Sequence, residues 1–146
     1  MVANVLVELS NRNIDKCFTY NVPLEFEKSI KIGIRVEVPF GKQYLEGFVL
    51  EINNDKEKDI ELKDIRRLID DEVILNDELL ELGKYIKKST LCTLISAYQV
   101  MLPKALKIAE SFLEKEMDAD KAASISKFIS AIKTAISYNS PLLIWW

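Results

Sequence analysis

Apolar and polar positions alternate with a period of two from residue 1 to about residue 70, the pattern of strands that bury one face. Turn-forming residues separate five such stretches, and we predict strands at residues 5–9, 18–22, 34–38, 46–52 and 62–69. The first strand is expected to be half-buried, and the third has the cleanest alternation of apolar and charged side chains. Short strands this close together predict a small antiparallel, barrel-like sheet.

Two residues constrain the backbone around the third and fourth strands. Pro39 has no N–H to donate, so we expect the third strand to end there or to reach an edge of the sheet. Residues 40–43 are predicted to form the turn that leads into the fourth strand. Gly47 lies inside that strand and predicts a bulge or a close approach of another backbone.

Beyond residue 75 the apolar period becomes that of a helix. Asn76 is the predicted N-cap of the first helix. The expected apolar face of that helix carries Leu79, Leu82 and Ile86. A shorter helix is predicted at about residues 93–101.

Residues 104–146 are predicted to be a helical tail with two apolar stripes. The stripes are expected to carry Ala105, Ile108, Phe112 and Leu113, and then Ile125, Phe128, Ile132, Ala135 and Ile136. The fold class that we expect is therefore α+β, with a small antiparallel barrel-like sheet followed by packed helices and a helical tail.

The composition is that of a globular protein, with 49% hydrophobic and 29% charged residues. The chain has no histidine, which excludes Cys/His zinc sites and histidine-based catalytic triads. Cys17 and Cys92 have apolar neighbours and are predicted to lie in the core. No stretch is long and apolar enough for a membrane span, so we expect a cytoplasmic protein with no membrane contact. We also expect no cofactor and no metal.

The turn after the third strand is the first candidate for chemistry. Gly41 permits a positive φ or a close approach of a ligand to the backbone. Lys42 can meet a phosphate, and Phe18 or Phe40 can stack on a base. The alternative is a hairpin turn that carries an exposed lysine.

A small basic cluster is the second candidate, because the net charge of −3 makes any nucleic-acid function depend on local features. The cluster consists of Lys63, Arg66 and Arg67, which can neutralise phosphates. The alternative is that these cations pair with nearby carboxylates, those of Asp64, Asp70 and Asp71.

Several segments match, in order, the pattern of one known family. The most specific is Gly33–Lys42, which is similar to the motif G-x-R-V-x-V-P-F-G. The others are the opening strand, Cys17–Pro23, Gly47–Val49, Leu62–Ile65 and the closing Leu102–Pro103. Over residues 3–106 the chain resembles the N-terminal domain of the primosomal protein N′ (PriA) family of replication-restart helicases.

The resemblance implies a 3′ DNA-binding domain at residues 1–106, which captures the 3′ end of the nascent leading strand at a stalled fork. It places Phe18, Thr19, Gly41 and Lys63 at the positions of the family's end-binding pocket, beside Lys42 of the turn. Forked DNA is the implied partner, and single-stranded-DNA-binding protein and other primosome proteins are further ones. Family members commonly have Asp where Thr19 stands, and the hydroxyl is a weaker hydrogen-bonding group.

The tail, residues 107–146, resembles a remnant of the family's winged helix or the lead-in to its helicase core. The chain contains no phosphate-binding loop, so we expect a truncated member that is not an enzyme and neither hydrolyses ATP nor unwinds DNA. Two alternatives remain open. One is a non-functional fragment, and the other is a protein-interaction module that uses the apolar segment Pro141–Trp146.

Overall fold

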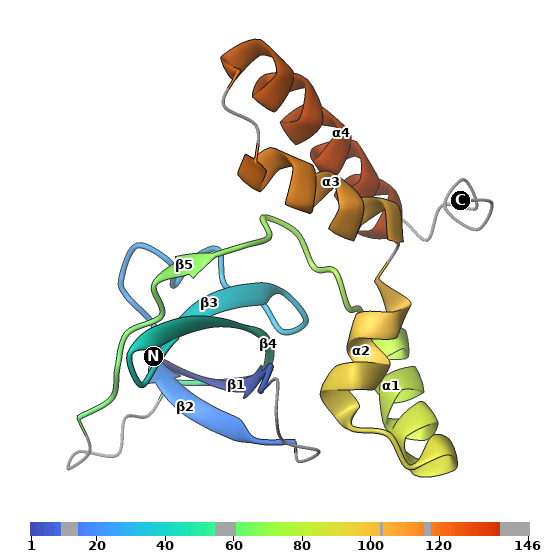
Figure 1. Ribbon diagram of the computed structural model, residues 1–146. Coiled ribbons are helices and arrows are strands. Elements are labelled where there is room, and N and C mark those ends of the chain that lie inside the picture. Colours follow the sequence, from blue (N-terminus) through green and yellow to red (C-terminus); the bar gives the residue numbers. More distant parts are fainter. Residues whose placement is uncertain (10–14, 55–60, 103, 116–117, 138–146) are drawn as a thin grey trace. The chain divides into compact units, whose positions relative to one another are not determined.

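The computed structural model describes residues 1–9, 15–54, 61–102, 104–115 and 118–137 (Figure 1). The chain divides into two compact units, Met1–Tyr98 and Gln99–Trp146. The strands are β1 (Val2–Val7), β2 (Cys17–Asn21), β3 (Arg35–Phe40), β4 (Gln43–Asn53) and β5 (Arg67–Leu68). The helices are α1 (Asp77–Thr90), α2 (Leu94–Met101), α3 (Lys104–Lys115) and α4 (Ala119–Ser137). This α+β architecture confirms the predicted fold class; the domain boundary predicted after residue 106 stays a prediction.

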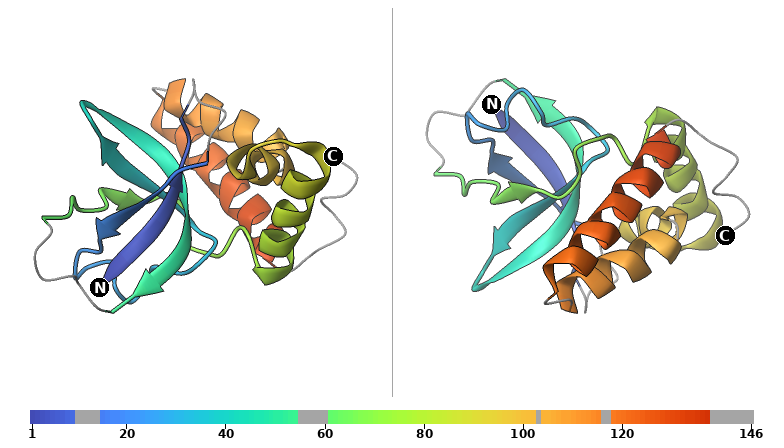
Figure 2. Two further views of the ribbon diagram at one scale, coloured as in Figure 1. Left: turned by 90° about the horizontal axis from the view of Figure 1, so that it is seen from below. Right: turned by 90° about the horizontal axis from the view of Figure 1, so that it is seen from above.

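The strands form one antiparallel sheet in the order β2-β1-β4-β3-β5. The sheet is strongly curved, as Figures 1 and 2 show, but it is open rather than closed into a barrel. β1 lies inside the sheet and is buried along almost its whole length. The expectation of a half-buried first strand at residues 5–9 is therefore wrong, because a strand covered on both faces has no polar side to present.

The segment before β5 links β2, at one edge of the open sheet, to β3 near the other edge. The N–H of Asn21 on β2 donates to the carbonyl of Lys63 (2.9 Å), and the N–H of Ile65 donates to the carbonyl of Asn21 (3.0 Å). One residue later, the N–H of Arg66 donates to the carbonyl of Glu37 on β3 (2.9 Å). Because its hydrogen bonds change partner along the way, the strand predicted at residues 62–69 is regular only at β5.

β3 continues through Pro39 and joins β4 by a two-residue turn, Gly41–Lys42. The carbonyl of Glu37 points to the β5 side of β3, and Pro39, two residues on, faces the same side. β5 pairs with β3 only at Val36 and Glu37, so no neighbouring strand lies beside Pro39 to accept an N–H. The second of the two expectations, that the strand reaches an edge at Pro39, is the correct one.

Gly47 makes the close backbone approach that the sequence predicts. A Cβ at this position would lie 2.5 Å from Cγ1 of Val5 and 2.8 Å from the carbonyl oxygen of Leu6. The pairing of β1 with β4 also shifts register between Asn4 and Val5, so that Leu50 is the extra residue of a bulge. Both features let β4 curve closely over β1.

A buried ion pair fixes β3 to the chain that follows β5. Arg35 and Asp70 are each 1% exposed. The guanidinium donates from Nε to Oδ2 (2.9 Å) and from Nη2 to Oδ1 (2.8 Å), and the backbone N–H of Arg35 also donates to Oδ2 (3.0 Å). Nη1 reaches the carboxylate of Glu46 at 3.3 Å. Such a bidentate pair satisfies charges that could not otherwise be buried.

α1 begins at the predicted N-cap, where the Asn76 side chain accepts a hydrogen bond from the N–H of Leu79 (2.9 Å). Its predicted apolar face is partly wrong. Leu82 is 45% exposed, and Leu80 is buried instead. The hydroxyl of Tyr98 on α2 donates to the carbonyl of Leu80 (3.3 Å), so packing against α2 decides which face of α1 is covered.

The Asp15 carboxylate ties the end of the β1–β2 connection to both helices of the first unit. It pairs with Lys87 on α1 (2.6 Å) and accepts from the N–H of Ile95 on α2 (3.2 Å). Burial acts to raise the pKa of Asp15, but the hydrogen bonds from Lys87 and from the N–H groups of Leu94 and Ile95 outweigh it and hold the pKa below its usual value.

In the second unit, α3 and α4 pack on each other through Leu106, Ala109, Ile129 and Ile132. None of the helices within the described residues is long and apolar enough to cross a membrane.

The buried pair predicts an asymmetry between two adjacent aspartates. Asp70→Asn leaves the Arg35 charge buried beside a neutral amide, and we expect a loss of about 3–5 kcal/mol of unfolding free energy. Asp71→Asn is the matched control, because Asp71 is exposed, and it should change stability by less than about 0.5 kcal/mol. Urea denaturation of both variants measures the difference, and equal midpoints would contradict the structural role of the pair.

Candidate functional site

The aromatic part of the candidate site joins β2 to the tip of the β3–β4 hairpin. The rings of Phe18 and Phe40 meet edge to face, with centroids 5.2 Å apart. Phe18 and Tyr20 project from the same face of β2, and the Tyr20 hydroxyl donates to the carbonyl of Pro39 (3.4 Å). These contacts place Phe18 beside the turn that carries Gly41. The sequence analysis had grouped Phe18 with this turn only because both suit DNA binding.

The backbone at Gly41 is open to a ligand. Gly41 has a φ of +62°, a left-handed conformation that favours glycine. A Cβ built there would meet no atom within 4 Å. Lys42 follows and is exposed, and its ammonium has no ion-pair partner among the residues that the structure describes. The turn can therefore offer both close backbone approach and an available cation.

Thr19 lies on the opposite face of β2 from Phe18, because consecutive strand residues alternate. Its hydroxyl donates to Oδ1 of Asn4 (2.7 Å), and Nδ2 of Asn4 donates to Oε2 of Glu51 (2.8 Å). This exposed polar row crosses three neighbouring strands. The two adjacent candidates Phe18 and Thr19 therefore cannot contact one ligand from the same face of the sheet.

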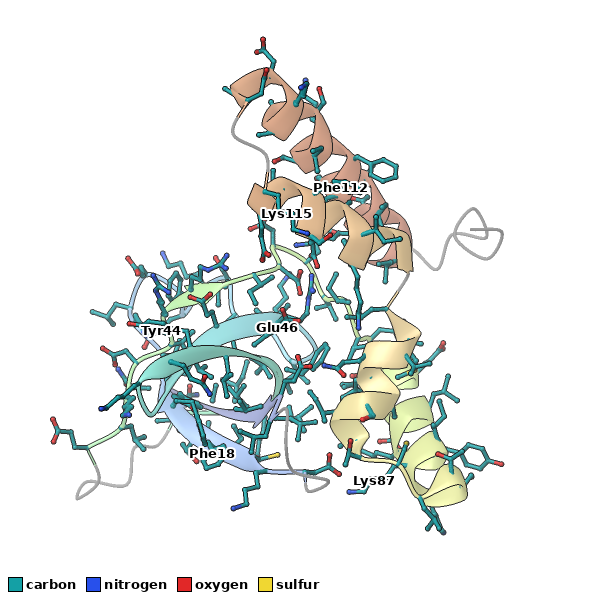
Figure 3. All side chains as sticks on the ribbon, viewed as in Figure 1. Phe18, Tyr44, Glu46, Lys87, Phe112 and Lys115 are labelled. Carbon is teal, nitrogen blue, oxygen red and sulfur yellow. The ribbon has the colours of Figure 1, made fainter. Side chains whose placement is uncertain are left out.

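Lys63 lies next to β2 through the backbone hydrogen bond between its carbonyl and Asn21, and its side chain is exposed. Beside it, Nδ2 of Asn21 donates to the carboxylate of Asp64. The predicted site residues therefore form two groups that share β2. Phe18, labelled in Figure 3, contacts Phe40, which precedes Gly41 and Lys42 at the hairpin tip, and Thr19 and Lys63 lie along the β2 edge.

The arginines of the basic cluster pair with a carboxylate that the sequence did not indicate. Nη1 of Arg66 and Nη2 of Arg67 both donate to Glu37, at 2.8 and 3.1 Å. The predicted alternative, pairing with Asp64, Asp70 and Asp71, is wrong for them, since Asp70 is engaged by Arg35. The hydrogen bond from Arg67, together with the charges of both arginines and the bond from Arg66, outweighs burial and lowers the pKa of Glu37.

Tyr44 is a candidate that sequence reasoning missed. The residue is 54% exposed, and the guanidinium carbon of Arg66 lies 4.1 Å from the ring centroid. The signal in the sequence was weak: an aromatic residue at a polar-face position just after the turn. The partner Arg66 is far along the chain, so only the pairing of β5 with β3 reveals the stack.

The cysteines do not take part in a buried core as expected, because Cys17 is exposed and Cys92 is half-buried. In the part of the chain that the structure describes, no group of three or more His, Cys, Asp and Glu side chains is placed to hold a metal ion.

An apolar groove lies between α3 and α4. Its volume is about 500 Å³, and its lining includes Ile108, Phe112 and Phe128, which are 55%, 61% and 55% exposed (Figure 3 labels Phe112). The predicted stripes are partly confirmed. These three side chains stay more than half exposed, whereas the contact between the helices includes four other stripe residues: Leu113, Ile125, Ile132 and Ile136. Ser124 is the polar side chain in the lining, so the groove offers no cation to a phosphate.

Comparisons with known proteins agree on one family. A family model described as the PriA 3′DNA-binding domain (3′BD) matches residues 4–103, a range that contains all five candidate residues. Replication restart protein PriA of Bacillus subtilis (strain 168) is 34% identical to this chain over 141 residues. That similarity covers 95% of this chain and therefore extends into α3 and α4, but the chain spans 18% of the length of the relative.

The Glu37 cluster predicts a pH-dependent contribution to stability. Because the pKa of Glu37 is lower in the folded chain, its stabilisation is present above the pKa of the unfolded chain and is lost as pH falls through the folded value. Glu37→Gln should cost up to about 1 kcal/mol at pH 7, since both arginines are more than half exposed.

The deficit of Glu37→Gln against the wild-type chain should shrink as pH falls below about 4. Thermal or urea unfolding of both chains across pH 3–7 checks it, with Glu25→Gln as an exposed control for general charge effects. A deficit that stays constant down to pH 3 would show that the ion pairs with Arg66 and Arg67 contribute nothing to stability.

Proposed function

The chain belongs to the PriA 3′DNA-binding domain family, and from this we propose that it captures the free 3′ end of a DNA strand at a stalled replication fork. The family identifies a DNA-binding domain. Its place in replication restart is inferred from the relative, which is named as a replication restart protein.

The observation that carries the proposal is the open backbone at Gly41 beside the Phe18–Phe40 pair. A terminal base has a neighbour on one side only, so it can leave the stack without melting a duplex and can present its face and edges to a protein. Phe18 supplies the aromatic wall in this proposal, and Gly41 gives the sugar access to the backbone.

Charge supports the same location. Lys42, in the β3–β4 turn, and Lys63, in the segment hydrogen-bonded to β2, are exposed cations, and each can neutralise a phosphate next to the end. The net charge of the whole chain is −3, so binding along arbitrary duplex should be weak. We propose recognition of an end, with few phosphate contacts, in place of general DNA affinity.

We further propose that this chain binds DNA without unwinding it. Its four glycines, Gly33, Gly41, Gly47 and Gly83, do not form a G-x-x-x-x-G-K sequence. Single-stranded-DNA-binding protein and other primosome proteins as partners, and a cytoplasmic location, stay predictions. The apolar segment invoked by the protein-interaction alternative, Pro141–Trp146, lies outside the described residues.

The 3′-hydroxyl provides the direct test. Fluorescence anisotropy on a fork whose leading strand ends in a 3′-hydroxyl should show tighter binding than on the same fork ending in 3′-phosphate, because the added charge and bulk occupy the position of the hydroxyl. A shallow salt dependence should accompany it, since each phosphate contact adds about one to the slope. Equal affinity for the two forks would contradict end capture, and no binding to either would favour the non-functional alternative.

Lys63→Gln should weaken binding to the 3′-hydroxyl fork and reduce the salt slope by about one, because it removes one phosphate contact. Lys88→Gln is the matched control, since Lys88 is an exposed lysine at the end of α1. If both variants bind alike, the two lysines act only through general charge and the role proposed for Lys63 is wrong.

Thr19→Asp tests the position at which the chain departs from the family. A carboxylate accepts stronger hydrogen bonds than a hydroxyl, so the preference for the 3′-hydroxyl fork should rise. Thermal unfolding serves as the control, because the new charge lies near Asn4 and Glu51. An unchanged preference in a folded variant would place Thr19 outside the contact.

A further inference from the structure

We propose that the Tyr44–Arg66 pair, on the outward face of the β3–β4 hairpin, is a second DNA contact on which an unpaired base of a single strand stacks. The inference deepens the proposed function and rests on it, because it extends the path of the DNA from the hairpin tip. Nothing in the family match assigns a role to either side chain.

The position of Tyr44 is unusual for an aromatic residue with a structural role. It pairs across the hairpin with Pro39, beyond the end of β5, and leaves 54% of its surface exposed. The guanidinium of Arg66 lies over one face of the ring, 4.1 Å from the centroid. An exposed aromatic ring paired with an arginine is the combination that binds bases without regard to sequence.

Glu37 orients the guanidinium of Arg66 for this contact. Its carboxylate accepts from Nη1 of Arg66 at 2.8 Å and from Nη2 of Arg67 at 3.1 Å, and its own side chain is 17% exposed. The guanidinium plane is therefore oriented before any ligand arrives, which lowers the entropy cost of binding. Nε and Nη2 of Arg66 have no partner among the described residues and can donate to a phosphate or a base edge.

The local charge also favours an anion. On this face three arginines are balanced by three carboxylates, and Lys42 at the hairpin tip leaves one positive charge in excess; the balanced groups are Arg35, Arg66, Arg67, Glu37, Glu46 and Asp70. This excess of positive charge lies on a chain whose net charge is −3. A polyanion would therefore be drawn to the hairpin in preference to most of the remaining surface.

The pair is continuous with the proposed end-binding site. Tyr44 follows Gln43, Gln43 pairs with Phe40, and the ring of Phe40 contacts Phe18. Figure 3 shows Tyr44 and Phe18 on the one sheet, Tyr44 toward β5 and Phe18 on β2. A strand whose last base lies at Phe18 and Gly41 would pass the hairpin tip and reach Tyr44 with a nucleotide a short way from its end.

Single-stranded DNA is the occupant that fits, because stacking on Tyr44 and Arg66 requires a base whose face is free. In a duplex the base faces are covered by their neighbours, and only phosphates would reach the arginine. The experiment therefore compares binding to single-stranded DNA with binding to duplex DNA.

The test uses the full chain and a short oligo-dT strand ending in 3′-phosphate, so that capture of a 3′-hydroxyl does not contribute. Tyr44→Ala should weaken anisotropy-detected binding by about 5- to 150-fold, the range for loss of one base stack. Tyr44→Trp should retain it, because indole offers a larger stacking face. Tyr85→Ala on α1 is the matched control, since Tyr85 is also an exposed tyrosine (68%).

The outcomes separate this inference from the proposed function. Loss of oligo-dT binding in Tyr44→Ala alone supports the stacking contact, even if the wild-type chain fails to distinguish 3′-hydroxyl from 3′-phosphate. Equal binding by Tyr44→Ala and Tyr85→Ala overturns it, as does an absence of wild-type binding to the blocked strand. An equal loss on blunt duplex DNA also overturns it, because that would show a phosphate contact without base stacking.

Discussion

The buried pair between Arg35 and Asp70 is the constraint on which the placement of the candidate site depends. Asp70 follows β5, and through its carboxylate the stretch that begins at Lys63 is anchored to β3. At its other end the same stretch is held to β2 by Asn21. A buried arginine is stable only when its charge is met, so the interaction fixes where this otherwise irregular segment lies. The Arg35–Asp70 pair therefore helps to position the cations of this segment, Lys63, Arg66 and Arg67.

The hairpin has a different chemistry on each of its faces. Phe40 turns inward toward Phe18, whereas Tyr44 turns outward and stacks on Arg66. Glu37 orients that arginine, and Gly41 leaves the tip between the two aromatic contacts without a side chain. A two-residue turn thus separates the two aromatic contacts, and the proposed path of the DNA strand passes from one to the other around this turn.

Local pattern predicted much of this arrangement. Alternation located β2, β3 and β4, the special properties of Gly41 and Gly47 were recognised from their positions, and Asn76 was identified as a helix cap. Motif order indicated the family, which the family match confirms. The failures share one cause. The burial of both faces of β1 and the exposure of Leu82 depend on what packs against each element, and sequence periodicity does not record the packing partner.

The sequence by itself determined which segments are strands and helices, where the backbone must turn, and which family the chain resembles, because each of these follows from neighbouring residues or from ordered motifs. Only the tertiary structure decided that Arg66 stacks on Tyr44, that Glu37 holds both arginines, and that the Thr19 hydroxyl donates to Asn4. Those contacts join residues that are distant along the chain or depend on the face that a strand presents. They are set by strand order and register, which become defined only when the whole sheet has assembled.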